Sequence, residues 1–362
     1  MPGGAADPPL ALTQRPNALC IEPPLSERKA SIAVLERNRV VGQRIARVMC
    51  AASGLMEVPC VDDPAELHKV LSKRPLLLGC DAQDLDLALE WAADRYPTLN
   101  LIVWTSSSIS SVLQAALQEP RLSSVIGWPS FESMPRPWEI AIAVRRILNP
   151  QSAPPRLSDL LAWGATIVKW RPRSSEERDR AVSEVGHWTE RAGAPSRIAE
   201  RLSELAHELL MNAMYDAPID SRGRPRYSYD RKKDIVLEEN EVPTLRLGTD
   251  GERIALQAHD PFGGLKRHHV FEGITRGLSA READSSSAKV LDTSRGGAGL
   301  GMLKIYTAGA VLVVDVDPSA STLVTSFYDL DVNPREFRSL PGSVHFFERP
   351  EAPVEATDQS AR

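Results

Sequence analysis

Short apolar runs rich in β-branched residues alternate with amphipathic helical stretches over residues 29–148. The runs read SIAVLE, MEVPCV, PLLLGC, NLIVWTS and SSVIGWP. The stretches between them, such as VGQRIARVMCAA, carry apolar residues at helical spacing. This alternation predicts an α/β unit in which a doubly wound, parallel, five-stranded sheet has helices on both faces. An amphipathic helix near Pro137–Leu148 is expected to close it.

The hydrophobic pattern changes in the second half of the chain. ATIVKWRPRS predicts a strand, and a long amphipathic helix over Arg197–Tyr215 is ended by Pro218. TLRLGTDGERIALQAHD predicts a hairpin that places Asp260 at a strand end. MLKIYTAGA, VLVVDVD and TLVTSFYDL predict a helix and two strands. The polar stretch Lys266–Arg295 between these groups is expected to form a mobile lid.

These patterns divide the chain into five segments. A proline-bearing leader at 1–28 is expected to be disordered, and residues 29–148 form the first domain. NPQSAPPRLS at 149–158 is expected to be a linker, followed by a second domain at 159–335. The tail at 336–362 is expected to be flexible, although its VHFF segment could dock against another part of the protein.

Composition limits the classes of partner. The chain has 362 residues and a net charge of −5, so no overall basic field attracts nucleic acid or an anionic membrane. The four cysteines form no CxxC pair, and no apolar run is long enough to span a bilayer. We therefore expect a cytoplasmic protein with reduced thiols and neither a nucleic-acid nor a membrane partner.

The stretch HELLMNAMYDAP, at residues 207–218, is the first candidate site. It places Glu208 and Asn212 four residues apart, on one face of the predicted helix, while Leu202, Leu205 and Leu209 line another face. Taken alone, the pair favours a solvated acid and amide on a helix exterior, because exposed polar helix faces are common. The two glycine-bearing stretches downstream favour a site.

Those stretches are DPFGG, which begins at Asp260 and contains Gly264, and GGAGLG. The second includes Gly297, Gly299 and Gly301 just before a predicted helix, where exposed amides and the helix dipole would hold phosphate oxygens. By themselves, the first could be a simple turn and the second a Rossmann loop.

Taken together, residues 157–330 resemble the GHKL ATPase superfamily, and within it most closely the anti-sigma-factor serine kinases. The resemblance implies an α+β two-layer sandwich of the Bergerat type that binds ATP and Mg²⁺. The chain departs from the family's DxGxG pattern because Phe262 occupies the place of the first glycine. It also lacks a histidine-kinase H-box with its helical hairpin ahead of the pocket.

The resemblance assigns roles to the motif residues. Asn212 would supply an amide oxygen to Mg²⁺ without adding negative charge near the triphosphate. Glu208 would be the base for a hydroxyl or water that attacks the γ-phosphate. Asp260 would accept a hydrogen bond from the adenine amino group. Thr322 would help fix the adenine through water, and the glycines named above, Gly264 included, would line the nucleotide.

The first domain resembles a response-regulator receiver. Asp81 fits the phosphoacceptor position and Thr105 the hydroxyl position. The acidic pair expected after the first strand is reduced to Glu36, and Trp128 stands where a lysine should precede a proline. Losing an acid and a cation weakens metal binding and acyl-phosphate stabilisation. We therefore expect a degenerate receiver used for protein contact, although Asp81 could still be a working acceptor or an ordinary loop residue.

The sequence thus predicts a bacterial signalling protein that binds Mg-ATP and phosphorylates a serine or threonine of a partner protein. The expected partner is an anti-sigma-antagonist-like protein or another regulator, and a homodimer is compatible with this class. One alternative is a binding switch in which ATP orders the lid without phosphoryl transfer. Another is an atypical histidine kinase, which the missing H-box disfavours.

Overall fold

The computed structural model of the chain describes residues 30–93, 96–107, 109–128, 136–286, 298–330 and 342–350. The predicted leader at 1–28 lies outside these residues. Within them the protein is a mixed α/β structure built on one large mixed sheet. No helix in the described ranges is both long and apolar enough to cross a bilayer.

The first five strands are short, buried and mutually parallel, as the alternation of strands and helices predicts. Their order in the sheet is that of a doubly wound fold, in which the chain reverses direction beside the first strand. In that order they are β2 (Cys60–Val61), β1 (Ile32–Leu35), β3 (Leu77–Asp81), β4 (Asn100–Thr105) and β5 (Leu122–Gly127).

Five helices accompany these strands: α1 (Arg39–Ser53), α2 (Leu67–Val70), α3 (Leu85–Ala92), α4 (Ser110–Gln118) and α5 (Pro137–Leu148). Helix α1 shows how local residues set where a helix begins and ends. The Asn38 side chain accepts hydrogen bonds from the first amides of α1, and Gly54 ends it with a φ of 73°. Helix α5 begins at a proline, whose missing N–H has no helical partner at that position anyway.

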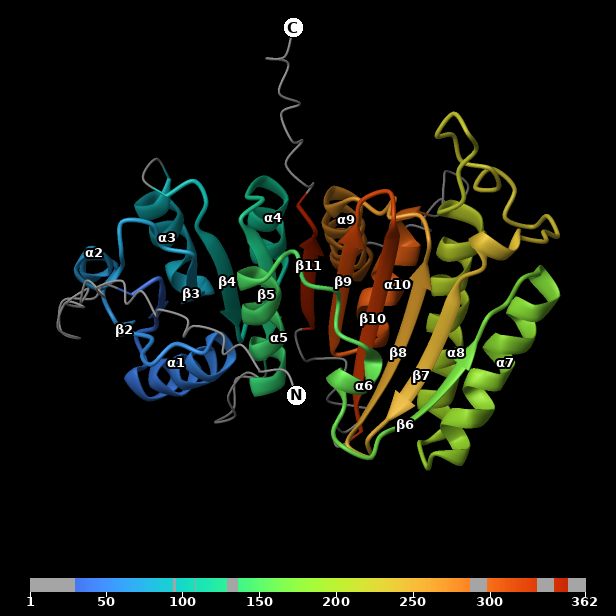
Figure 1. The fold of residues 1–362 in the computed structure, drawn as a ribbon, viewed down its shortest axis with the longest axis horizontal. Coiled ribbons are helices and arrows are strands. Elements are labelled where there is room, and N and C mark those ends of the chain that lie inside the picture. The colour runs from blue at the N-terminus through green and yellow to red at the C-terminus, as the bar shows by residue number, and fades with distance from the viewer. Residues whose placement is uncertain are drawn as a thin grey trace, which may run out of the picture.

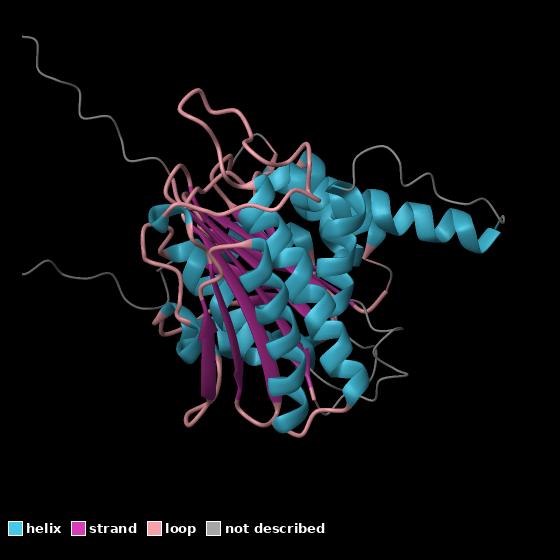
Figure 2. Ribbon diagram, turned by 90° about the vertical axis from the view of Figure 1, so that its right-hand side faces the viewer, coloured by secondary structure: helices cyan, strands magenta, loops and turns pink. Residues whose placement is uncertain are grey.

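The second half of the chain adds an antiparallel set of strands, β6 (Thr166–Trp170), β7 (Thr244–Thr249), β8 (Arg253–Asp260), β9 (Val311–Asp317) and β10 (Ser321–Asp329). Its helices are α6 (Leu157–Leu160), α7 (Ser175–Arg191), α8 (Ser196–Met211), α9 (Arg267–Ser286) and α10 (Ala298–Ala308). Helices α7 to α10 lie behind the strands in Figure 1, and Figure 2 shows the strands and these helices as two layers.

Strand β11 (Ser343–Glu348) joins the two halves. It pairs antiparallel with β5 and parallel with β9, so the full order is β2-β1-β3-β4-β5-β11-β9-β10-β8-β7-β6 (Figure 1). The predicted flexible tail therefore differs from the structure at residues 343–348. Val344 to Phe347 are all buried, so both faces of β11 are covered, and VHFF docks in the middle of the sheet.

Buried polar contacts reinforce this junction. Arg146 of α5 donates through Nε to Asp315 of β9 at 2.7 Å, and both side chains are buried. Arg146 also donates to the Ser152 carbonyl oxygen at 2.7 Å, which ties the predicted linker to α5. Arg136, just before α5, pairs with Asp329 of β10 at 2.8 Å. One continuous apolar core runs under both halves.

Candidate functional site

Helix α8 is amphipathic, as predicted, but its last turn is a π-helical turn that the sequence did not predict. Leu202, Leu205 and Leu209 are buried, as the sequence indicates. The helix then widens into a π-helical turn (η4, Asn212–Asp216), closed by the Ala217 amide donating to the Asn212 carbonyl oxygen at 2.9 Å. A π turn holds one more residue than an α turn, and such turns recur at functional sites. The turn begins at the predicted metal ligand.

Glu208 lies against the first turns of α10. Its Oε1 is 2.6 Å from Nζ of Lys304, and its Oε2 lies 3.1 Å from the place where a β-carbon on Gly301 would sit. Gly301 therefore gives the Glu208 carboxylate room to approach the helix. Sequence reasoning named Glu208 and Gly301 and missed Lys304, because only the packing of α8 on α10 brings residue 304 to residue 208.

Asn212 is partly buried, and its side-chain amide makes no hydrogen bond to any described residue. Asp216, at the end of the π turn, pairs with Arg231 through two guanidinium nitrogens. Burial raises the pKa of the Asp216 carboxyl, Arg231 opposes that rise, and the nearby Glu208 charge adds to it. An amide oxygen without a partner between two acids fits a hard cation such as Mg²⁺.

Asp260 ends β8 and lies directly opposite Thr322 of β10 in the antiparallel ladder. Burial raises the pKa of the Asp260 carboxyl to about 6, although the Phe262 amide, the Thr322 hydroxyl and the Gly263 amide counteract it. The Thr322 hydroxyl is itself buried without a well-formed hydrogen bond to any described atom. An ionised carboxylate has about four acceptor sites, so Asp260 can accept a further donor beside the buried Thr322 hydroxyl.

The DPFGG turn contains a constrained glycine that the sequence motif did not single out. Gly263 has a φ of +66°, and a β-carbon there would overlap the Asp317 carbonyl oxygen. Gly264, the predicted motif glycine, has nothing within 4 Å of such a β-carbon. The required glycine is therefore Gly263, which packs the Asp260 turn against the β9–β10 connection. The backbone amide of Phe262 donates to Asp260 Oδ1 at 3.0 Å and so helps to hold the turn.

The second glycine motif is described only in part. Gly297 lies outside the described residues, and Gly299 is in the first turn of α10. The elements that carry the predicted site are neighbours, since α8 packs on α10 and the π turn contacts β8. The structure thus brings Glu208, Asn212 and Gly301 to one region bordered by β8.

The prediction of a lid without regular structure is wrong for residues 267–286, which form helix α9. Val270, Phe271 and Ile274 are buried at helical spacing, a stripe hidden among polar neighbours in the sequence. Arg267 anchors the start of α9 by donating to the Leu122 carbonyl oxygen at 2.6 Å. The rest of the predicted lid, 287–295, lies outside the described residues.

Asp81 ends β3, and its Oδ1 accepts a hydrogen bond from the Gln83 amide at 2.8 Å, while burial raises the pKa of its carboxyl. The Glu36 carboxylate also accepts a hydrogen bond, from Trp104 Nε1 at 2.8 Å. The next residue, Arg37, points at the buried Asp84 with nitrogen–oxygen distances of 2.5 and 3.0 Å. A guanidinium thus neutralises an acid at the edge where a receiver would bind a metal ion.

Metal-binding clusters of three or more histidine, cysteine or acidic residues are absent from the described ranges, including this edge. Sequence reasoning missed the Arg37–Asp84 pair. The signal available was an arginine in place of the second acid, but its partner lies 47 positions away.

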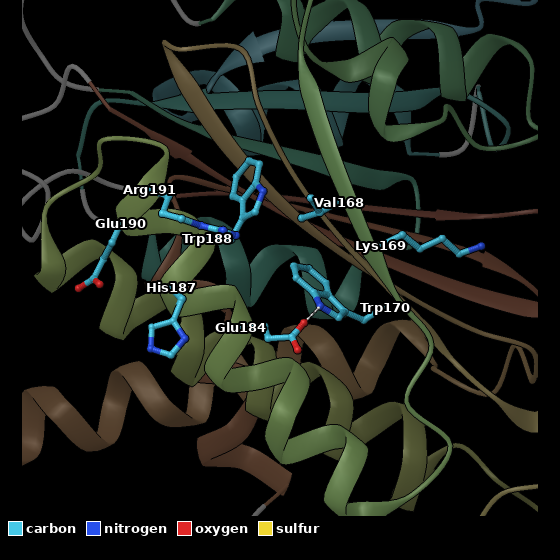
Figure 3. Close-up of a pocket in the computed structure, with 8 residues that line it drawn as sticks. All are labelled: Val168, Lys169, Trp170, Glu184, His187, Trp188, Glu190 and Arg191. Atoms are coloured by element: carbon cyan, nitrogen blue, oxygen red, sulfur yellow. Dashed lines mark hydrogen bonds between the residues drawn. The ribbon is translucent and has the colours of Figure 1, made fainter.

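A separate open pocket lies at the outer edge of the sheet, between β6 and α7 (Figure 3). Trp170 of β6 donates to Glu184 of α7 at 2.5 Å, and Trp188 stands on another side of the hollow. It contains none of the predicted site residues. Its lining is Val168, Lys169, Trp170, Glu184, His187, Trp188, Glu190 and Arg191.

The chain is similar in part to a known family. Residues 131–230 are similar to phage tail protein (Tail_P2_I). The matched stretch includes α5 to α8 and the π turn, and so contains Glu208 and Asn212 but not Asp260. It covers 100 of the 362 residues, so it does not establish the family of the chain. No curated protein matches the chain.

Proposed function

We propose that the protein binds Mg-ATP in the region bordered by α8, β8 and α10, and transfers the γ-phosphate to a serine or threonine of a partner protein. The observation that carries this proposal is the pairing of the largely desolvated Asp260 carboxylate with the buried Thr322 hydroxyl across the ends of β8 and β10. The adenine amino group is a donor that would satisfy the carboxylate. Guanine presents a carbonyl at that position and would be rejected.

The phosphate end of the proposed site is built from α8 and α10. Asn212 would hold Mg²⁺ through its amide oxygen, which is not hydrogen-bonded within the part of the chain that the structure describes, and the ion would neutralise charge on the phosphates. The start of α10 offers backbone amides and the positive end of its dipole to phosphate oxygens. Glu208, one helical turn before Asn212, is positioned to accept the proton of the attacking hydroxyl.

The first half of the chain is proposed to be a receiver-like contact domain without phosphoacceptor chemistry. Two observations support this role: the parallel order of β1 to β5, and the use of Arg37 to neutralise Asp84. Strand β11 extends the sheet from β5 to β9, so a protein bound to the first half would act on a sheet shared with the second.

A binding switch without phosphoryl transfer is the second candidate. The observation that favours it is the ion pair of Glu208 with Lys304, which occupies the proposed base. In that case ATP binding would change the contacts of α10 and so alter the surface of this protein that a partner binds.

Calorimetry tests the binding step. Wild-type protein should bind ATP, and Asn212→Ala should weaken binding only when Mg²⁺ is present. Asp260→Ala should weaken binding with or without the metal, and GTP should not replace ATP. If wild type binds neither nucleotide, the proposed function is wrong.

Phosphate transfer separates the two candidates. The protein is incubated with γ-labelled ATP and cell extract, and labelled proteins are analysed for phosphoserine and phosphothreonine. Glu208→Gln should keep ATP affinity and abolish labelling. Equal labelling with this variant would remove Glu208 as the base, and no labelling by wild type would favour the switch.

A further inference from the structure

Lys304 contributes the cation nearest to the proposed base. It lies one turn after Gly301 on α10, so both residues are on one face of the helix. The Glu208 carboxylate lies between them, 2.6 Å from Nζ of Lys304. The Lys304 side chain is 66% exposed and that of Glu208 only 13% exposed.

The surrounding charges are arranged as two ion pairs. Glu208 pairs with Lys304 from α10, and Asp216 of the π turn pairs with Arg231 from the loop before β7. Partial desolvation lowers the pKa of the neighbouring His207, and Arg178 of α7 lowers it further. In this state each acid of the proposed phosphate region is engaged by a cation.

The Lys304 pair is suited to exchange. A pair with one partner largely exposed is weak, and a lysine on its four-carbon stem can move its ammonium group while the helix stays in place. A triphosphate carries more negative charge than a carboxylate. Lys304 is three residues from Gly301, so phosphate oxygens bound at the start of α10 would lie within its range.

We propose that Lys304 changes partners, pairing with Glu208 when the site lacks a triphosphate and with the γ-phosphate when ATP is bound. The inference rests on the proposed function and adds the phosphate-binding lysine and its regulation of the base. Release of Glu208 occurs only when the γ-phosphate is in place.

The exchange is compatible with the bonds formed and broken in phosphoryl transfer. The acceptor hydroxyl gives its proton to the freed Glu208 carboxylate as its oxygen bonds to the γ-phosphorus. The bond from that phosphorus to the bridging oxygen breaks, and ADP leaves with the electron pair. Lys304 stays with the transferred group, where its charge offsets the charge developing on the phosphate oxygens.

The test compares ATP with ADP, since ADP has no γ-phosphate. Calorimetry is run with Mg²⁺ on wild type, Lys304→Met, Lys304→Arg and the control Arg180→Met, which removes a cation from an exposed pair on α7. Lys304→Met should weaken ATP binding about tenfold, the loss expected for one charge-assisted contact, and leave ADP binding unchanged. Lys304→Arg should recover most of the affinity for ATP, and Arg180→Met should change neither.

Each other outcome has a separate meaning. Equal weakening of ATP and ADP by Lys304→Met would show a structural role for Lys304 and overturn the exchange. Unchanged affinity for both nucleotides in Lys304→Met would also overturn it while leaving the proposed function standing. Failure of wild type to bind either nucleotide would overturn both proposals.

Discussion

Glu139 of α5 and His345 of β11 meet in the protein interior, with Oε1 2.9 Å from Nε2 and both side chains 1% exposed. They are 206 positions apart in the chain, and their contact holds the late strand β11 to the first half of the protein. His345 Nδ1 is buried without a hydrogen bond to any described atom, so the ring depends on Glu139 for its polar contact.

Loss of the Glu139 charge is expected to destabilise the protein. Glu139→Gln removes the buried carboxylate that contacts His345 and one of the two acids that pair with Arg136, which should lower the free energy of unfolding by about 3–5 kcal/mol. Urea denaturation at pH 7 measures the change. The control Glu176→Gln, from an exposed pair on α7, should cost less than about 1 kcal/mol. Equal costs would show that the buried pair is unimportant.

Glu139 also gives the stability a predicted pH dependence. Burial opposes its ionisation, but His345 and Arg136 outweigh burial and lower its pKa below the ordinary 4.5. The ionised form therefore stabilises the fold above pH 4.5, and this contribution is lost as pH falls through the folded-state pKa. Acid denaturation should be less steep for Glu139→Gln than for wild type. A parallel pH profile would contradict the assignment.

ATP binding is expected to depend on the ionisation of Asp260. Its pKa is about 6, and only the carboxylate accepts a hydrogen bond with both oxygens. Affinity for ATP should therefore fall about tenfold between pH 7 and pH 5 in wild type. Asp260→Asn should show no such dependence when calorimetry is repeated across this range. Identical profiles would exclude Asp260 as the adenine ligand.

The same residue should lower the stability of the nucleotide-free protein at high pH. Because the folded-state pKa of Asp260 is raised from 3.8, its contribution is full below pH 3.8 and is lost as pH rises through about 6. Asp260→Asn resembles the protonated form. Its thermal midpoint should exceed that of wild type at pH 8 and approach it at pH 5, as differential scanning calorimetry would show.

Gly263 and Gly264 provide a matched pair of substitutions. Gly263→Ala must adopt a positive φ and displace the Asp317 carbonyl, so it should cost at least about 1–3 kcal/mol of stability. Gly264→Ala, with open space around its β-carbon, should change stability by less than about 0.5 kcal/mol. Chemical denaturation of both variants gives the comparison. The reverse order would contradict the assignment of the constrained glycine.

Acetyl phosphate is expected not to label Asp81. Trp104 and the Asn38 amide occupy both Glu36 oxygens, and Arg37 neutralises Asp84, so the edge offers no metal ligand set. Mass spectrometry after incubation with acetyl phosphate and Mg²⁺ should find unmodified protein. Stable phosphorylation that is abolished by Asp81→Asn would show that this edge is a working phosphoacceptor site.

Hydrophobic spacing and turn residues predicted a strand or helix well where the pattern lies within one short segment of the chain. The apolar runs of the first half became β1 to β5, and the TDGE turn joined β7 to β8 with Asp260 at the end. The helix that carries Glu208 was predicted because its buried leucines repeat at helical spacing. The stripe of α9 was missed because polar residues surround its few apolar positions.

The sequence by itself determined which segments form strands and helices, and which chemical groups stand at their ends. Only the tertiary structure decided that β11 inserts between β5 and β9, that Arg37 neutralises Asp84, and that Lys304 pairs with Glu208. Periodicity and turn chemistry act within a few residues and leave a readable pattern. These strand pairings and ion pairings join positions 32 to more than 200 residues apart, and they form only when the shared core brings those positions together.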